Sequence, residues 1–213
     1  MGYIENLEKR WSELLANTSK TKSAQELQAY TAEVFALSKE IELERAKEYQ
    51  GLIYELADIG IIVNSIWDLV NTKTKYPEAI PILMKYLPLV NYIRNKEGIV
   101  RALSVKEAKG LILPLMIKEY MLLTKDKENL RWLIGNAVNA TITKEEVELI
   151  FPIVLNKGNG LSRQMFVAAL GKINTEKVRE ILKQLLNDDD KVISEEAQKA
   201  LKKLGEKNLP KNT

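Results

Sequence analysis

An apolar pattern recurs in this sequence with a period close to 33 residues, and this repeat constrains the fold more than any other feature. Four apolar segments lie at residues 79–83, 112–116, 150–154 and 178–182, and the first three contain a proline. Each is followed by a segment centred on a small residue and an aliphatic one: Ala102-Leu103, Ala137-Val138, Ala169-Leu170 and Ala200-Leu201. Such a period is typical of stacked helical hairpins. One hairpin cannot bury both its apolar faces, so neighbouring hairpins must cover them and an elongated all-α solenoid is expected.

The second segment of each repeat also predicts which residues form the core. Counted from Lys96, Arg131, Arg163 and Ser194, the positions three, six and seven residues later are apolar and share one helix face. They are Ile99, Ala102, Leu103, Ile134, Ala137, Val138, Phe166, Ala169, Leu170, Ala197, Ala200 and Leu201. Residues 54–71 are interpreted as the second helix of an earlier, degenerate unit, with Ile66 in the place of Ala102 and Trp67 in the core.

The first 40 residues are predicted to form a helical cap on the repeats. Apolar residues at steps of three and four predict a helix over 3–16, and Ser23 with Glu26 forms a capping box that begins a second helix. The residues expected to pack inward are Leu27, Tyr30, Val34, Leu37 and Ile41. The predicted domains are therefore a cap over 1–40, a solenoid over 41–205 and a polar tail over 206–213.

Composition excludes most familiar catalytic chemistry. The chain has no cysteine and no histidine, so thiolate nucleophiles, Ser-His pairs and the usual zinc and haem sites are absent. We expect neither an enzyme nor a cofactor. The net charge of +3 is too small to make nucleic acid or an anionic membrane the default partner. The first residues do not resemble a signal peptide and no long apolar stretch occurs, so a cytoplasmic location without membrane contact is expected.

The second segments resemble the HEAT-repeat family, in particular its short bacterial form, which also occurs in phycobilin lyases. That family's second helix carries a basic residue, two others, a small apolar residue, two others and then Ala-Leu. Residues 131–138 (RWLIGNAV) and 163–170 (RQMFVAAL) follow this pattern, 96–103 begins with lysine, and 194–201 lacks the base. The resemblance implies a right-handed superhelix from about residue 41 to 205. It implies no particular function, because HEAT repeats serve as adaptors, inhibitors, lyases and DNA glycosylases.

Lys96, Arg131 and Arg163 occupy equivalent positions, and we call them the basic row. Aligned along a groove, they could bind phosphates or an acidic partner. In HEAT proteins, however, the equivalent base commonly pairs with an acid or a carbonyl of the next unit, and this stacking role is the favoured interpretation.

Other polar motifs are better explained by structure than by chemistry. Asp188, Asp189 and Asp190 supply the oxygen ligands of a hard cation, yet acids ahead of a helix more commonly cap it, so no metal site is predicted. Residues 156–160 are interpreted as a turn between helices. Trp67-Asp68 and Arg131-Trp132 are superficially similar to the aspartate and tryptophans of HEAT-like DNA glycosylases.

The favoured function is a non-catalytic scaffold or adaptor that binds a protein partner on the concave face of the solenoid. Positions one, five and eight residues after each base share a face opposite the core. The partner-binding residues are predicted to be Glu97, Arg101, Trp132, Asn136, Asn139 and Gln164, with Arg131 and Arg163. Trp132 is either a binding hot spot or a filler between hairpins. The alternative function is nucleic-acid binding or excision of alkylated bases through Lys96, Arg101, Arg131 and Arg163, and tetrapyrrole binding is disfavoured.

Overall fold

The computed structural model describes residues 2–16 and 23–206, and these residues contain helices and no strand. The helices are α1 (Tyr3–Ala16), α2 (Ala24–Asp58), α3 (Ile66–Asn71), α4 (Ala79–Tyr86), α5 (Ile93–Ala102), α6 (Leu113–Leu122), α7 (Glu128–Thr141), α8 (Phe151–Leu155), α9 (Gln164–Leu170), α10 (Glu176–Leu185) and α11 (Lys191–Glu206). The predicted all-α class is confirmed. Apart from Glu206, the predicted polar tail lies outside the described residues.

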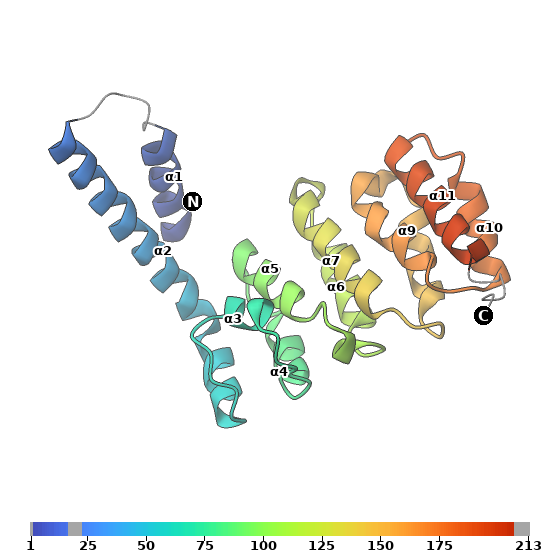
Figure 1. The fold of residues 1–213 in the computed structure, drawn as a ribbon, viewed down its shortest axis with the longest axis horizontal. Helices are drawn as coiled ribbons and strands as arrows, with labels where there is room; N and C mark the ends of the chain where they lie inside the picture. The colour runs from blue at the N-terminus through green and yellow to red at the C-terminus, as the bar shows by residue number, and fades with distance from the viewer. Residues whose placement is uncertain (1, 17–22, 207–213) are drawn as a thin grey trace, which may run out of the picture.

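The repeats form an elongated row of helical hairpins (Figure 1). Each first helix contacts the second helix that follows it, in the pairs α4–α5, α6–α7, α8–α9 and α10–α11. The second helices also contact one another in series, from α3 through α5, α7 and α9 to α11. Every hairpin therefore covers an apolar face of its neighbour, as the period in the sequence predicts.

The predicted core is confirmed at eleven of its twelve positions, which are at most 4% exposed, and Leu201 is partly buried. Pro81, Pro114 and Pro152 all lie in the first turn of a first helix. Proline is tolerated there because the N–H that it lacks would have no partner within the helix. The proline in the apolar run thus marks where a first helix begins.

The N-terminal hairpin differs from the expected cap. Its apolar cluster is small, consisting of Leu7, Leu37 and Ile41 with Trp11 and Leu14 at its margin, and it is separate from the main core. Among the described residues before Ala46, no apolar residue belongs to the main core or packs against it. Figure 1 shows α1 and the first half of α2 extending away from the row. The described residues of 1–40 therefore pack mainly against each other.

The second half of α2 covers the end of the row instead. Helix α2 continues past the predicted boundary at residue 40 as far as Asp58, with a kink at Tyr49. Below the kink, Leu52 and Leu56 are buried in the main core, and α2 contacts α4. Ser23 and Glu26 do form the predicted capping box. Leu27, expected to pack inward, is 56% exposed because it lies beyond the reach of the small cluster.

The interpretation of residues 54–71 as one helix is wrong. Helix α2 ends at Asp58, Gly60 takes a positive φ of 83°, and α3 begins only at Ile66. Glycine fits that φ because it has no Cβ to clash with the backbone. Ile66 is thus the first residue of its helix, whereas Ala102 is the last of α5. The shifted register leaves Trp67 36% exposed rather than in the core.

Polar contacts join the N-terminal hairpin to the row. The Tyr92 hydroxyl donates a hydrogen bond to the Glu8 carboxylate, which also pairs with Arg45. Burial and the bond to Glu8 raise the pKa of Tyr92 to about 12, so the phenol stays protonated and remains a donor at neutral pH.

Replacing Leu37 by alanine should loosen the N-terminal hairpin without loosening the repeats. Truncating a buried leucine costs about 2–5 kcal/mol, and Leu37 belongs only to the small cluster. Hydrogen exchange should accelerate in α1 and the first half of α2, while α7 and α9 keep their protection. Leu133→Ala is the matched control, because Leu133 is equally buried but lies in the main core. If α7 lost hydrogen-exchange protection equally in both variants, the small N-terminal cluster and the main core would not be energetically separate.

Candidate functional site

The basic row lies inside the stack of repeats, close to the start of three second helices. Lys96 in α5 donates a hydrogen bond from Nζ to the Leu87 carbonyl at 3.2 Å and forms an ion pair with Glu119 of α6. The Lys96 side chain is 15% exposed and that of Glu119 only 3%. The lysine therefore ties the end of its own first helix to the first helix of the next hairpin.

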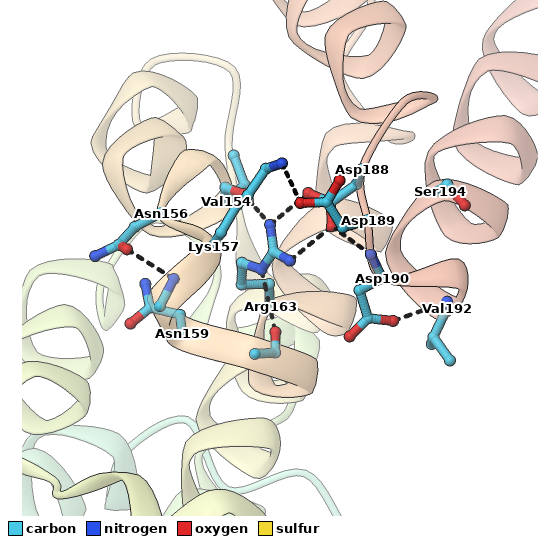
Figure 2. A network of polar contacts seen from close by, with 12 residues as sticks. Val154, Asn156, Lys157, Asn159, Arg163, Asp188, Asp189, Asp190, Val192 and Ser194 are labelled. Atoms are coloured by element: carbon cyan, nitrogen blue, oxygen red, sulfur yellow. Dashed lines mark hydrogen bonds and ion pairs between the residues drawn. The ribbon is translucent and has the colours of Figure 1, made fainter.

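Arg163 makes the most complete set of contacts (Figure 2). Its two terminal nitrogens donate to the two carboxylate oxygens of Asp188, at 2.8 and 2.9 Å. It also donates to the carbonyls of Val154 and Gly160, at 3.2 and 3.1 Å. A paired geometry of this kind is among the strongest hydrogen-bonding arrangements in proteins. The side chains of Arg163 and Asp188 are at most 3% exposed, so the pair is an internal bridge between two hairpins.

Arg131 fills the equivalent place between these two bases, with different partners. Its guanidinium lies 4.4 Å from the centre of the Tyr120 ring and donates to the Asn159 side-chain oxygen at 2.7 Å. The Tyr120 hydroxyl lies 2.8 Å from the Ser162 hydroxyl, which continues the network toward Arg163. Arg131 Nε is buried without a hydrogen-bond partner among the described residues. At Arg131, the Tyr120 ring and the Asn159 amide take the place of the carboxylate that pairs with Lys96 and with Arg163.

Arg131 and Arg163 were predicted to contact a partner, and the structure corrects this. They are 6% and 1% exposed, because their guanidinium groups are used between neighbouring hairpins. Pairing of the basic row within the stack, the interpretation favoured from the sequence, agrees with these contacts.

The three aspartates at 188–190 act as bridges and caps (Figure 2). Asp190 accepts the backbone N–H of Val192 at 2.9 Å, at the start of α11. Asp189 pairs with Lys157 at the surface, and Arg163 holds the pKa of Asp188 below its usual value. Within the described part of the chain, no three Asp, Glu, His or Cys side chains are placed so that together they could hold a metal ion.

The exposed part of the predicted site lies on α5, α7 and α9, and we call it the Trp132 face. It comprises Glu97, Arg101, Trp132, Asn136, Asn139 and Gln164. Trp132 is 37% exposed and its indole Nε1 donates to Gln164 Oε1 at 3.1 Å, which joins α7 to α9. Asn136 and Gln164 are partly exposed beside it, and Arg101 is exposed on α5.

Glu97 and Asn139 offer less free polar surface than the other members of the Trp132 face. Glu97 lies 3.8 Å from Arg94 in an ion pair on the surface of α5. The side-chain oxygen of Asn139 is buried without a hydrogen-bond partner among the described residues. Exposed polar contact on this face therefore comes mainly from Asn136, Gln164 and Arg101.

A cleft of about 660 Å³ was missed by the sequence analysis. It lies where α2 meets α3 and α5, and its lining includes Tyr49, Trp67, Arg45 and Asn95. Asp68, next to Trp67, uses one carboxylate oxygen to accept the backbone N–H groups of Asn64 and Ser65, at 2.8 and 3.0 Å. The expected likeness of Trp67-Asp68 to a glycosylase site is therefore explained by capping of α3. The exposure of Trp67 could have been predicted from the sequence only if the start of α3 had been placed correctly.

Comparison with family models, with curated proteins and with solved structures finds no match to this chain. Within the described residues, no helix combines the length and the apolar character needed to cross a bilayer.

Replacing Asp188 by asparagine should strongly destabilise the stack, because it leaves the Arg163 charge buried without its counterion. Breaking such a pair costs about 3–5 kcal/mol in unfolding free energy. Asp189→Asn, which removes an exposed partner of Lys157, should leave the stability almost unchanged. Denaturant unfolding of the three proteins measures the difference, and equal stabilities would show that the bridge contributes nothing.

The difference between the wild type and Asp188→Asn should depend on pH. Because Arg163 lowers the pKa of Asp188 in the folded state, the carboxylate contributes stability above its unfolded pKa, and this contribution is lost as the pH falls through the folded value. The two unfolding free energies should therefore converge below about pH 4, the ordinary value for aspartate. A difference that stays constant down to pH 2 would contradict this assignment.

Proposed function

We propose that this chain is a non-catalytic scaffold or adaptor that binds a protein partner with the Trp132 face of a right-handed, HEAT-like solenoid. Support for the HEAT-like assignment comes from the contacts. The second helices stack in series, their Ala-Leu positions are buried, and a base near the start of three of them bridges to the next hairpin. On this proposal the protein is bacterial, acts in the cytoplasm and needs no cofactor.

The observation that carries the proposed function is the position of Trp132. More than a third of its surface is exposed, yet its indole N–H is already used by Gln164 of the next hairpin. A ring fixed in this way loses little conformational freedom on binding, so more of the contact energy remains for affinity. Tryptophan is one of the residues enriched at the hot spots of protein interfaces.

The chemistry around Trp132 favours a protein over a nucleic acid. Phosphate contacts supply most of the affinity for a nucleic acid, and they need exposed bases. Of the four bases in the alternative hypothesis, Arg131 and Arg163 are buried, Lys96 is paired with Glu119, and Arg101 alone is exposed. The amides of Asn136 and Gln164 instead offer both donors and acceptors, which suits a peptide backbone.

Replacing Trp132 by alanine should weaken partner binding by about 2 kcal/mol or more while thermal stability barely changes. Trp67→Ala is a matched control, because Trp67 lies on another second helix and is equally exposed. Proteins captured from the source cell by the immobilised wild-type chain should be lost with Trp132→Ala and kept with Trp67→Ala. A loss of about 3 kcal/mol or more in folding stability would instead identify Trp132 as a structural filler.

Binding to duplex DNA tests the alternative function directly. Fluorescence anisotropy with labelled duplex DNA is measured at low and at physiological salt. It should show no binding at physiological salt, because few basic side chains are free to contact phosphates. Tight, strongly salt-dependent binding that Arg101→Ala weakens would reverse the ranking of the two functions.

A further inference from the structure

An exposed leucine recurs where the first helix of each hairpin ends. These are Leu89, Leu122, Leu155 and Leu186, spaced 33, 33 and 31 residues apart in the sequence. Each lies at or just beyond the last residue of α4, α6, α8 or α10, and their exposures range from 38% to 69%. Single exposed apolar residues are ordinary on protein surfaces, but one that recurs with the period of the fold is not expected by chance. We call these four residues the leucine edge.

The stacking of the hairpins brings the leucine edge to one side of the row. All four hairpins run in the same sense, so their internal turns meet along one edge, the upper edge of the row in Figure 1. Contacts between successive turns confirm this arrangement. Asn159, in the turn before α9, contacts Arg131 near the start of α7, and Lys157 in the same turn pairs with Asp189 in the next.

Lysines accompany the leucines one helical turn earlier in the chain. Lys118 precedes Leu122 by four residues and Lys183 precedes Leu186 by three, which places each pair on one helix face. Both lysines are exposed and form no ion pair with another described residue. Lys85 holds the same place before Leu89, although it pairs with Glu55. Unpaired lysines thus lie close in sequence to two of the four leucines of the edge, and the exposed Asp126 and Asp189 lie in the turns that follow them.

We propose that the leucine edge binds an acidic amphipathic helix of a partner protein, laid along the row. Packed helices lie about 8–10 Å apart, so successive hairpins present a leucine at about this interval. Seven residues of an α-helix rise about 10.5 Å, so a helix with an apolar residue at every seventh position meets one leucine per hairpin. Glutamates flanking its apolar stripe would face Lys118 and Lys183. The leucine edge shares no residue with the Trp132 face, and on this proposal the two surfaces bind different partners.

A designed peptide tests this match between spacing and charge. The probe is a fluorescein-labelled helix of about four heptads with leucine at every seventh position and glutamates beside it. Anisotropy at about 50 mM salt should show binding to the wild type, because exposed charges attract over longer distances at low ionic strength. A peptide of the same composition with its leucines scattered around the helix should bind at least about tenfold more weakly. Absence of binding to the wild type at about 100 µM peptide, or equal binding of both peptides, would overturn the proposal.

Variants of the protein locate the binding surface. Leu89→Ser with Leu122→Ser removes two apolar contacts and should weaken binding at least about tenfold. The matched control is Leu111→Ser with Leu149→Ser, since these leucines are also about half exposed but precede α6 and α8, at the other ends of those helices. The control should change the affinity by less than about twofold, with both variants melting near the wild type because exposed positions contribute little to stability. Equal weakening in both pairs would contradict the assignment.

Two further variants test the role of charge and whether the leucine edge is separate from the Trp132 face. Lys118→Glu with Lys183→Glu should weaken binding of the acidic peptide and improve binding of a peptide whose glutamates are replaced by lysines. Trp132→Ala should leave peptide binding unchanged, so that failure of the Trp132 face and failure of the leucine edge are told apart. Loss of peptide binding in Trp132→Ala would show that the leucine edge is not a separate site.

Two other ligands of the leucine edge would give different experimental results. Self-association of the wild type in sedimentation equilibrium, abolished by Leu89→Ser with Leu122→Ser, would assign the edge to a second copy of this chain. Sedimentation with vesicles of phosphatidylserine and phosphatidylcholine, lost in the same variant, would assign it to a lipid surface. Either result would overturn the proposal of a partner helix.

Discussion

A positive charge buried between neighbouring hairpins is the constraint on which the row of repeats depends. Taking Arg163 out of water is tolerable only because Asp188, from the next hairpin, meets it with two hydrogen bonds. Lys96 depends in the same way on Glu119, and Arg131 on the ring of Tyr120 and the amide of Asn159. Apolar contacts between helices would tolerate small slides and rotations, whereas a buried ion pair has one satisfactory geometry. These contacts therefore favour the register in which the hairpins stack.

The periodic part of the fold could be predicted from the sequence because each repeat carries its own evidence. Proline marks the first turn of a first helix, and the Ala-Leu positions mark the face that neighbours cover. The N-terminal region lacks this repetition. Its helix over 3–16 and its capping box are as predicted, whereas the expected packing of residues 1–40 against the first repeat is not found. Periodicity shows that α2 has an apolar face, but it does not show which element covers that face. The kink at Tyr49 and the positive φ at Gly60 are local features of the backbone, which a pattern of apolar residues does not reveal.

The position of the basic row could be predicted from the spacing of the repeats, but its inward direction only from the resemblance to HEAT repeats. Equal spacing identified the basic row, yet a long side chain at a helix start can turn outward to solvent or inward to the next hairpin. The evidence for the inward choice lies in the partners: Glu119 follows Lys96 by 23 residues and Asp188 follows Arg163 by 25. A search for acids at that interval would have found both pairs. It would have missed Arg131, whose charge rests against Tyr120 without a carboxylate.

The inward basic row also determines what remains for recognition. Had these bases pointed outward, the face of the second helices would carry a line of positive charge suited to phosphates. Because they are used for stacking, that face presents an indole, amides and one exposed arginine, while free lysines lie at the turn edge beside the exposed leucines. Because the hairpins stack at a regular distance, equivalent residues of successive hairpins are also regularly spaced. A surface that takes one residue from each hairpin therefore has a regular spacing. A partner that binds along the row must match that interval, and a helix with a seven-residue repeat comes close to it, because seven residues rise about 10.5 Å.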